Sequence, residues 1–148
     1  MEMALDQARL ALSHGDVPVG AVAVKGGMVI ASAHNERELR GDPTAHAEIL
    51  VLRASAAKLK TWRLSGTTVY VSLEPCPMCA GALVAGRVAR VVYAAADEKA
   101  GAAWSLYNIV QDPRLNHNCK LTSGVLAAES AEILQSFFSD KRKKLQPF

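Results

Sequence analysis

Apolar and polar positions divide the first third of the chain into one helix and two strands. Apolar residues recur at helical spacing over residues 4–13, and Gly15 is placed to end that helix. Two β-rich runs follow, at 17–24 and 28–33. The Lys25-Gly26-Gly27 segment between them suits a tight hairpin, because glycine readily adopts positive φ angles. The pattern therefore predicts a helix followed by an antiparallel pair of strands.

The middle of the chain predicts a further helix and then a β-α-β unit. A helical stretch follows a polar loop and covers about residues 46–58. Two strand-like runs, 67–73 and 90–95, flank a short helical segment at 77–84. Strands joined through a helix pair in parallel with a right-handed crossover, and open α/β sheets bind ligands beyond the C-terminal ends of such strands. Cys76 follows the first of these strands, so we expect it at a ligand site.

The last third of the chain completes an α/β pattern. A short apolar segment at 104–110 lies in a loop, and it is followed by a predicted fifth strand at 120–125 and a terminal helix at 127–144. An antiparallel hairpin combined with a parallel pair gives a mixed sheet. The sequence thus predicts an α/β fold with a mixed five-stranded sheet.

Composition narrows the class of protein further. The 148 residues, half of them apolar, can bury a sizeable core but are few for two domains, so we expect a single domain over 1–148. No apolar run approaches the roughly 20 residues of a membrane-spanning helix, and Met1-Glu2-Met3 lacks the blocks of a secretory signal. Three cysteines are a poor disulfide framework. We therefore expect a cytoplasmic protein without a membrane partner.

The net charge of +3 is modest, but part of the positive charge is concentrated in the terminal helix. Lys141-Arg142-Lys143-Lys144 closely follows Phe137 and Phe138, and such groups can bind phosphates and stack on unpaired bases. The alternative is a solvated helix end, whose cations suit the negative end of the helix dipole. The sequence leaves both interpretations open.

Two short motifs carry the candidate chemistry. His46-Ala47-Glu48 precedes Pro75-Cys76-Pro77-Met78-Cys79, and each motif lies at a predicted helix start. Proline favours the first position of a helix, so Pro77 predicts Cys76 at the cap and Cys79 one turn later. The positive end of the helix favours the thiolate form that binds metal. His46, Cys76 and Cys79 are therefore candidate ligands of one zinc ion.

Two thiolates and one imidazole leave the fourth position of a tetrahedral zinc ion open, which is typical of a catalytic site. Zinc lowers the pKa of bound water from 15.7 to about 7, and Glu48 is the candidate group to transfer its protons. On a regular helix, residues two apart project about 200° from one another. His46 and Glu48 can converge only if His46 lies in an irregular first turn.

The alternative at this site is a closed structural zinc site. A fourth ligand would then come from Cys119, His14, His34 or His117. None of these residues has the paired spacing of a ligand set. The combination of His-x-Glu with Pro-Cys-x-x-Cys is instead typical of zinc-dependent nucleobase deaminases.

The chain closely resembles the bacterial tRNA-specific adenosine deaminases, the TadA family of the cytidine and deoxycytidylate deaminase superfamily. The resemblance covers roughly residues 4–145, and these segments carry it: Val17-Pro18-Val19-Gly20-Ala21-Val22, His34-Asn35, Asp42-Pro43-Thr44-Ala45-His46-Ala47-Glu48-Ile49, Glu74-Pro75-Cys76-Pro77-Met78-Cys79-Ala80-Gly81-Ala82 and Gly101-Ala102-Ala103. It implies a three-layer α/β/α cytidine deaminase-like fold and a homodimer. It also implies conversion of adenosine to inosine at the wobble position of a tRNA anticodon, usually that of the arginine tRNA with anticodon ACG.

The resemblance also assigns roles to single residues. It implies one zinc ion per chain, held by His46, Cys76 and Cys79, with Glu48 as the proton carrier. It implies that Asn35 hydrogen-bonds the flipped base. It implies that the terminal helix and the loop after the fourth strand contribute to RNA binding, with Phe137, Phe138 and Arg142 of the helix in contact with the tRNA anticodon loop. Trp104 lies where a smaller residue is expected in this family.

Two other functions remain possible from the sequence. The same metal site would serve a deaminase of a free nucleobase or nucleoside, such as guanine or cytosine. A non-catalytic RNA-binding module on a deaminase fold would keep the basic cluster but lose Glu48 or a metal ligand. None of those residues is missing here.

Overall fold

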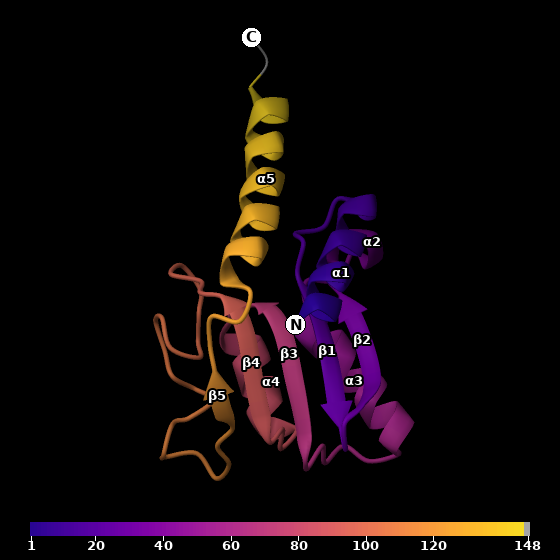
Figure 1. Cartoon of the computed structure of the whole chain (residues 1–148), viewed down its shortest axis with the longest axis vertical. Coiled ribbons are helices and arrows are strands. Elements are labelled where there is room, and N and C mark those ends of the chain that lie inside the picture. The colour runs from indigo at the N-terminus through magenta and orange to yellow at the C-terminus, as the bar shows by residue number, and fades with distance from the viewer. Residues whose placement is uncertain (147–148) are drawn as a thin grey trace.

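The computed structural model describes residues 1–146 as a five-stranded sheet with helices around it (Figure 1). Its elements in chain order are α1 (Glu2–Ala11), η1 (Leu12–His14), β1 (Gly20–Lys25), β2 (Met28–His34), α2 (Arg37–Arg40), α3 (Ala47–Leu59), β3 (Thr67–Leu73), α4 (Pro77–Ala85), β4 (Arg90–Ala95), β5 (Lys120–Thr122) and α5 (Ala127–Leu145). Among these residues no helix is both long and apolar enough to span a membrane.

The sheet is mixed, as the sequence predicts. Its strand order is β2-β1-β3-β4-β5. Strand β1 pairs antiparallel with both β2 and β3, whereas β3, β4 and β5 run parallel. The predicted hairpin turns through Gly26 and Gly27, whose φ angles of 58° and 74° are costly for other residues. The parallel β3–β4 pair confirms the predicted β-α-β unit.

Helices cover both faces of the sheet. Helix α1 packs on β1, whereas α3 and α4 pack together on the opposite face (Figure 1). The approach of α1 is so close that a Cβ at Gly20 would lie 2.0 Å from the carbonyl oxygen of Ala4. Buried apolar side chains such as Val51, Val71 and Leu83 fill the core between the layers. This arrangement is the expected α/β/α fold.

Helix α5 has a different relation to the sheet. Near its start, Ser130 is buried and its hydroxyl donates a hydrogen bond to the carbonyl oxygen of Ser72 in β3. Leu134, one turn later, is also buried. Beyond these turns α5 rises away from the sheet, at the end where β3 and β4 finish (Figure 1). The basic residues Lys141–Lys144 therefore lie on a projecting, exposed part of the helix.

Most predicted boundaries agree with the structure to within two residues, and three larger differences have a physical reason. Strand β1 begins at Gly20, not at residue 17, because Pro18 has no N–H for a ladder and the Val19 N–H donates to Val17. Strand β5 ends at Thr122, since the chain turns at Gly124 with a φ of 80°. The short helix α2 lies within the predicted loop, where no apolar period indicates it.

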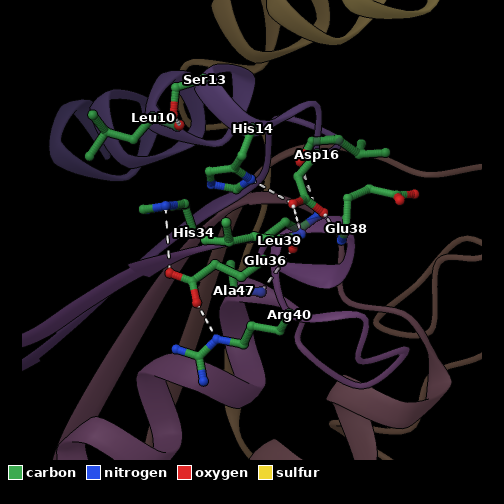
Figure 2. Close-up of polar contacts among 12 residues, drawn as sticks. Leu10, Ser13, His14, Asp16, His34, Glu36, Glu38, Leu39, Arg40 and Ala47 are labelled. Atoms are coloured by element: carbon green, nitrogen blue, oxygen red, sulfur yellow. Dashed lines mark hydrogen bonds and ion pairs between the residues drawn. The ribbon is translucent and has the colours of Figure 1, made fainter.

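A buried carboxylate that the sequence analysis did not single out fixes α2. Asp16 is 2% exposed and accepts hydrogen bonds from the backbone N–H groups of Glu38 (2.9 Å) and Leu39 (3.3 Å), as Figure 2 shows. The Nδ1 atom of His14 lies 2.6 Å from the same carboxylate. Burial raises the pKa of Asp16, but the hydrogen bonds from Glu38, Leu39 and His14 outweigh it, so the pKa is lowered. Asp16 thus joins α2 to the end of η1.

We expect Asp16→Asn to lower the free energy of unfolding by about 1–3 kcal/mol at neutral pH, because the amide nitrogen cannot accept the bonds that one oxygen now accepts. The lowered pKa stabilises the fold above the ordinary aspartate range, and this contribution is lost as the pH falls from that range through the lowered pKa of Asp16. Urea unfolding at pH 7 and pH 3 measures both effects. Asp6→Asn, at an exposed residue, is the control; an equal loss in both variants would contradict the role of Asp16.

Candidate active site

The backbone places His46 just outside α3. His46 is the N-cap residue, with an extended conformation of φ −75° and ψ 149°, and the helix begins at Ala47. A turn precedes it, in which the Asp42 carboxylate accepts hydrogen bonds from the N–H (2.8 Å) and hydroxyl (2.7 Å) of Thr44. Since His46 is not helical, the 200° separation expected within a helix does not apply. The side chains of His46 and Glu48 can therefore approach the same site, which a regular helix through both residues would not allow.

Asn35 supplies the helix cap that His46 lacks. The side chain of His46 makes no capping hydrogen bond. Instead, Oδ1 of Asn35 accepts the N–H of Ala47 at 2.8 Å, and Nδ2 of Asn35 donates to the carbonyl oxygen of Val17 at 3.0 Å. Asn35 is buried, and each of its amide atoms can form one further hydrogen bond. A contact between Asn35 and a substrate base stays a prediction.

The two cysteines lie in the first turn of α4, as the sequence predicts. Cys76 is the N-cap with φ −73° and ψ 173°, and Pro77 occupies the first helical position. Cys79 is fully buried one turn later, whereas Cys76 is half-buried. Both helix starts face the end of the sheet where the parallel strands finish, which brings α3 and α4 ligand atoms together.

The side chains of His46, Cys76 and Cys79 form one compact group. The Sγ atoms of Cys76 and Cys79 lie 3.7 Å and 3.4 Å from Nδ1 of His46. A tetrahedral zinc ion with ordinary Zn–S and Zn–N bonds separates sulfur and nitrogen ligands by about 3.6 Å. The observed spacing fits that value, so this group can hold a metal ion.

Electrostatics within the group favour the thiolate form, which binds metal, at Cys76 but not at Cys79. The hydrogen bond from Cys79, aided by His46, lowers the pKa of Cys76 to about 4. The same contact, together with burial, raises the pKa of Cys79. The Cys76 interaction raises the pKa of His46 against the effect of burial. A bound cation would displace the protons that these groups share, because metal ligands must be deprotonated.

Glu48 lies beside the group without belonging to it. It is 4% exposed in the first turn of α3, and its Oε1 atom has no hydrogen-bond partner. Burial raises the pKa of Glu48, while nearby Cys79 and His46 oppose that increase. A buried carboxyl with a raised pKa and one oxygen atom without a hydrogen-bond partner is suited to accept and release protons.

The four residues considered as a fourth ligand make other contacts. His14 and His34 stack on each other with ring centroids 5.3 Å apart. Nε2 of His117 lies 2.7 Å from the carbonyl oxygen of Val88, and Cys119 is buried against the core. Within residues 1–146 the group that could hold a metal ion comprises only the three predicted side chains. The structure gives no support to a closed structural site.

The aromatic and basic residues of α5 form a separate cluster. The Phe137 and Phe138 rings meet edge to face at 5.3 Å, and Nζ of Lys141 lies 5.1 Å above the Phe137 ring. Phe137 also lines a groove of about 740 Å³ between α1 and α5, whereas Phe138 and Arg142 are exposed. The structure therefore does not group Phe137, Phe138 and Arg142 with His46. Their contacts with RNA stay a prediction.

Sequence reasoning gave no role to Glu74, although it lies two residues before Cys76. Glu74 is 2% exposed and accepts several hydrogen bonds from the loop after β4. The sequence feature that could have indicated Glu74 is its place directly after the apolar strand β3. An acidic residue buried there requires hydrogen-bond partners. Which partners it has depends on the loop conformation, which the hydrophobic pattern does not specify.

The fold, together with a His-Cys-Cys group that could hold a metal ion and a neighbouring carboxyl, is that of a deaminase class. A family model described as MafB19-like deaminase matches residues 1–142. The tRNA-specific adenosine deaminase of Bacillus subtilis (strain 168) is 49% identical over 144 residues, covering 97% of this chain and 89% of that protein. The corresponding protein of Aquifex aeolicus (strain VF5) is 43% identical over 145 residues, covering 98% and 95%. The chain belongs to the family of tRNA-specific adenosine deaminases.

Solved structures agree with this family. One structure, from work on A-to-I editing by tRNA:A34 deaminases at the wobble position of transfer RNA, is 45% identical with a TM-score of 0.87, covering 90% of this chain and 97% of that one. A guanine deaminase from Nitrosomonas europaea is 25% identical with a TM-score of 0.77, covering 93% and 82%. The free-base enzyme therefore shares the fold at lower sequence identity.

Proposed function

We propose that this protein is a zinc-dependent hydrolase that converts adenosine to inosine at the wobble position of a tRNA anticodon and releases ammonia. The observation that carries the proposal is the group of His46, Cys76 and Cys79 with the buried Glu48 beside it. The family to which the chain belongs supports the choice of tRNA adenosine as the substrate. We further propose one zinc ion per chain, a homodimer and a cytoplasmic location.

His46, Cys76 and Cys79 would hold the zinc ion, which supplies an acidified water molecule for attack on C6 of adenine. Glu48 accepts a proton from that water and transfers it to N1 of the base. Glu48 then takes the second proton from the hydroxyl oxygen now on C6 and delivers it to the amine; as the C6–N6 bond breaks, the amine leaves as ammonia and the C6–O bond becomes the carbonyl of inosine. The raised pKa of Glu48 suits a group that both accepts and releases protons.

The substrate base must leave its stack to reach a buried carboxyl. Unstacking costs a few kcal/mol in a duplex and less in a single-stranded loop, so an anticodon loop is favoured over paired RNA. Asn35 is proposed to hydrogen-bond the flipped base. Its amide already bonds Val17 and Ala47, but its oxygen can accept, and its nitrogen donate, one further hydrogen bond. The arginine tRNA with anticodon ACG is the proposed substrate.

The test is direct. The zinc-loaded protein is incubated with transcribed arginine tRNA of anticodon ACG, and inosine is detected as an adenosine-to-guanosine change on sequencing. A transcript with guanosine at the wobble position is the control. Absence of conversion by protein that contains one zinc per chain would refute the proposed activity.

Deamination of a free base is the second candidate, because the guanine deaminase of Nitrosomonas europaea shares the fold. Release of ammonia from free guanine or cytosine, without conversion of tRNA, would support this alternative. A non-catalytic RNA-binding module is disfavoured, since His46, Cys76 and Cys79 form a group that could hold a metal ion and Glu48 is present.

We expect the basic end of α5 to contribute to tRNA binding. In the double variant Arg142→Gln, Lys143→Gln, tRNA affinity should fall, and the slope of log K against log salt should become shallower by about 0.7–0.9 for each phosphate that the variant no longer neutralises. Lys58→Gln, Lys60→Gln is the matched control, since these exposed lysines lie at the far end of α3. Filter binding over a salt series measures both. Equal slopes for the two variants would contradict a role of α5.

A further inference from the structure

Glu74 is a buried charge that the proposed chemistry does not use. It follows the last residue of β3 and is separated from Cys76 by Pro75. Its residue exposure is 2%. Removing a carboxylate from water is costly unless hydrogen bonds replace the lost hydration, so its partners indicate its role.

All five hydrogen bonds to the Glu74 carboxylate come from one loop. Oε1 accepts the N–H of Asp97 (3.1 Å) and the hydroxyl of Ser105. Oε2 accepts three consecutive N–H groups, those of Ala103 (3.2 Å), Trp104 (3.0 Å) and Ser105 (2.9 Å). Residues 97–105 thus fold around a single side chain, and we refer to them as the Glu74 loop.

A carboxylate is the suitable side chain for this position. When ionised it only accepts hydrogen bonds, and it offers about four lone-pair sites to convergent donors. Burial raises the pKa of Glu74, but the bonds from Ser105, Asp97 and Trp104 outweigh it, so the pKa is lowered and the charged form is retained. Consecutive backbone N–H groups form a concave anion site of this kind.

The loop also contacts the segment that carries Cys76. The N–H of Ala102 donates to the carbonyl oxygen of Pro75 at 2.8 Å, one residue before Cys76. A Cβ at Gly101 would lie 2.3 Å from Oε2 of Glu74, so only glycine permits this approach. The Glu74 loop is therefore packed against the start of α4, beside the proposed metal site.

The other side of the loop faces solvent with large side chains. Trp104 is 71% exposed, and Tyr107, just beyond the loop, is 57% exposed. Aromatic surfaces of this kind stack with unpaired bases. Their position depends on the backbone of residues 103–105, which Glu74 holds directly.

We propose that Glu74 is a positioning residue that orders the Glu74 loop at the rim of the active site and so determines how tightly the tRNA substrate binds. The proposal rests on the proposed function for its substrate. Its structural half, the ordering of the loop by one carboxylate, does not depend on which substrate the enzyme accepts.

Glu74→Gln tests the proposal with little change in volume. The glutamine oxygen can still accept the three consecutive N–H groups, but its nitrogen then faces the N–H of Asp97, donor against donor. We expect faster amide exchange across residues 97–105 and a KM for tRNA raised by about tenfold, with little change in kcat. Zinc content and the thiolate-to-metal absorption of the Co²⁺-loaded enzyme should not change.

Two further variants keep the test decisive. Ser105→Ala removes a single donor from the same carboxylate, folds with least risk, and should shift exchange and KM in the same direction by a smaller amount. Glu2→Gln removes one charge from an exposed residue of α1, outside the Glu74 loop, and should leave both unchanged.

Distinct results would overturn the proposal. Unchanged exchange and KM in Glu74→Gln would show that Glu74 does not order the loop. Loss of zinc, or a fall in kcat at constant KM, would show that it acts on the metal site instead. If the wild-type enzyme forms no inosine in tRNA, the proposed function fails, and amide exchange still decides whether Glu74 orders the loop.

Discussion

Glu48→Gln is expected to reduce inosine formation by at least about a hundredfold, because general acid–base catalysis contributes roughly 10²–10⁴-fold and this is the proposed proton carrier. Zinc content should stay at one per chain, since Glu48 lies outside the group of three ligand side chains. The melting temperature should stay equal or rise. In the wild type, burial of a carboxyl whose Oε1 lacks a partner is unfavourable, and the neutral amide reduces that penalty.

Three measurements check this expectation: single-turnover inosine formation, zinc by atomic absorption, and thermal unfolding. Glu48→Ala should lose activity in the same way. Glu129→Gln, an exposed acidic residue in the first turn of α5, is the charge-matched control and should retain turnover. Substantial inosine formation by zinc-loaded Glu48→Gln would refute the role of Glu48.

Cys79→Ser is expected to abolish stoichiometric zinc binding and activity together. Cys79 is fully buried, and its Sγ lies 3.4 Å from Nδ1 of His46, so its replacement removes one of three donors. Loss of a residue that only supports a ligand costs about 10- to 100-fold in metal affinity, and loss of a ligand should cost more. Because bound metal stabilises the folded state, a chelator should lower the melting temperature of the wild type but not that of Cys79→Ser.

Cys119→Ala is the matched control, since Cys119 is a buried cysteine outside the metal-binding group. Burial raises the pKa of its thiol to about 11, so it stays protonated and is a poor ligand. This variant should bind one zinc per chain and form inosine. Full zinc occupancy in Cys79→Ser would contradict the proposed ligand set.

The helix starts of the site were predictable because they depend on local chemistry. Pro77 suits the first helical position, and this places Cys76 at the cap and Cys79 in the first turn whatever surrounds them. The position of His46 was less certain, because only the fold shows that it lies outside α3 in an extended conformation. Asn35, and not His46, caps α3 by accepting the N–H of Ala47, which lies twelve residues later in the chain. No local sequence pattern relates these two segments.

The sequence by itself determined the order of helices and strands, the mixed α/β class and the residues that could bind a metal. Hydrophobic period, glycine turns and proline positions act over a few residues, so they can be recognised without a fold. Only the tertiary structure decided where the buried charges find partners. Asp16 accepts a hydrogen bond from Glu38 in α2, 22 residues away along the chain. Glu74 accepts hydrogen bonds from a loop that begins 23 residues later, at Asp97. Desolvation requires such bonds, but it does not specify which distant backbone supplies them.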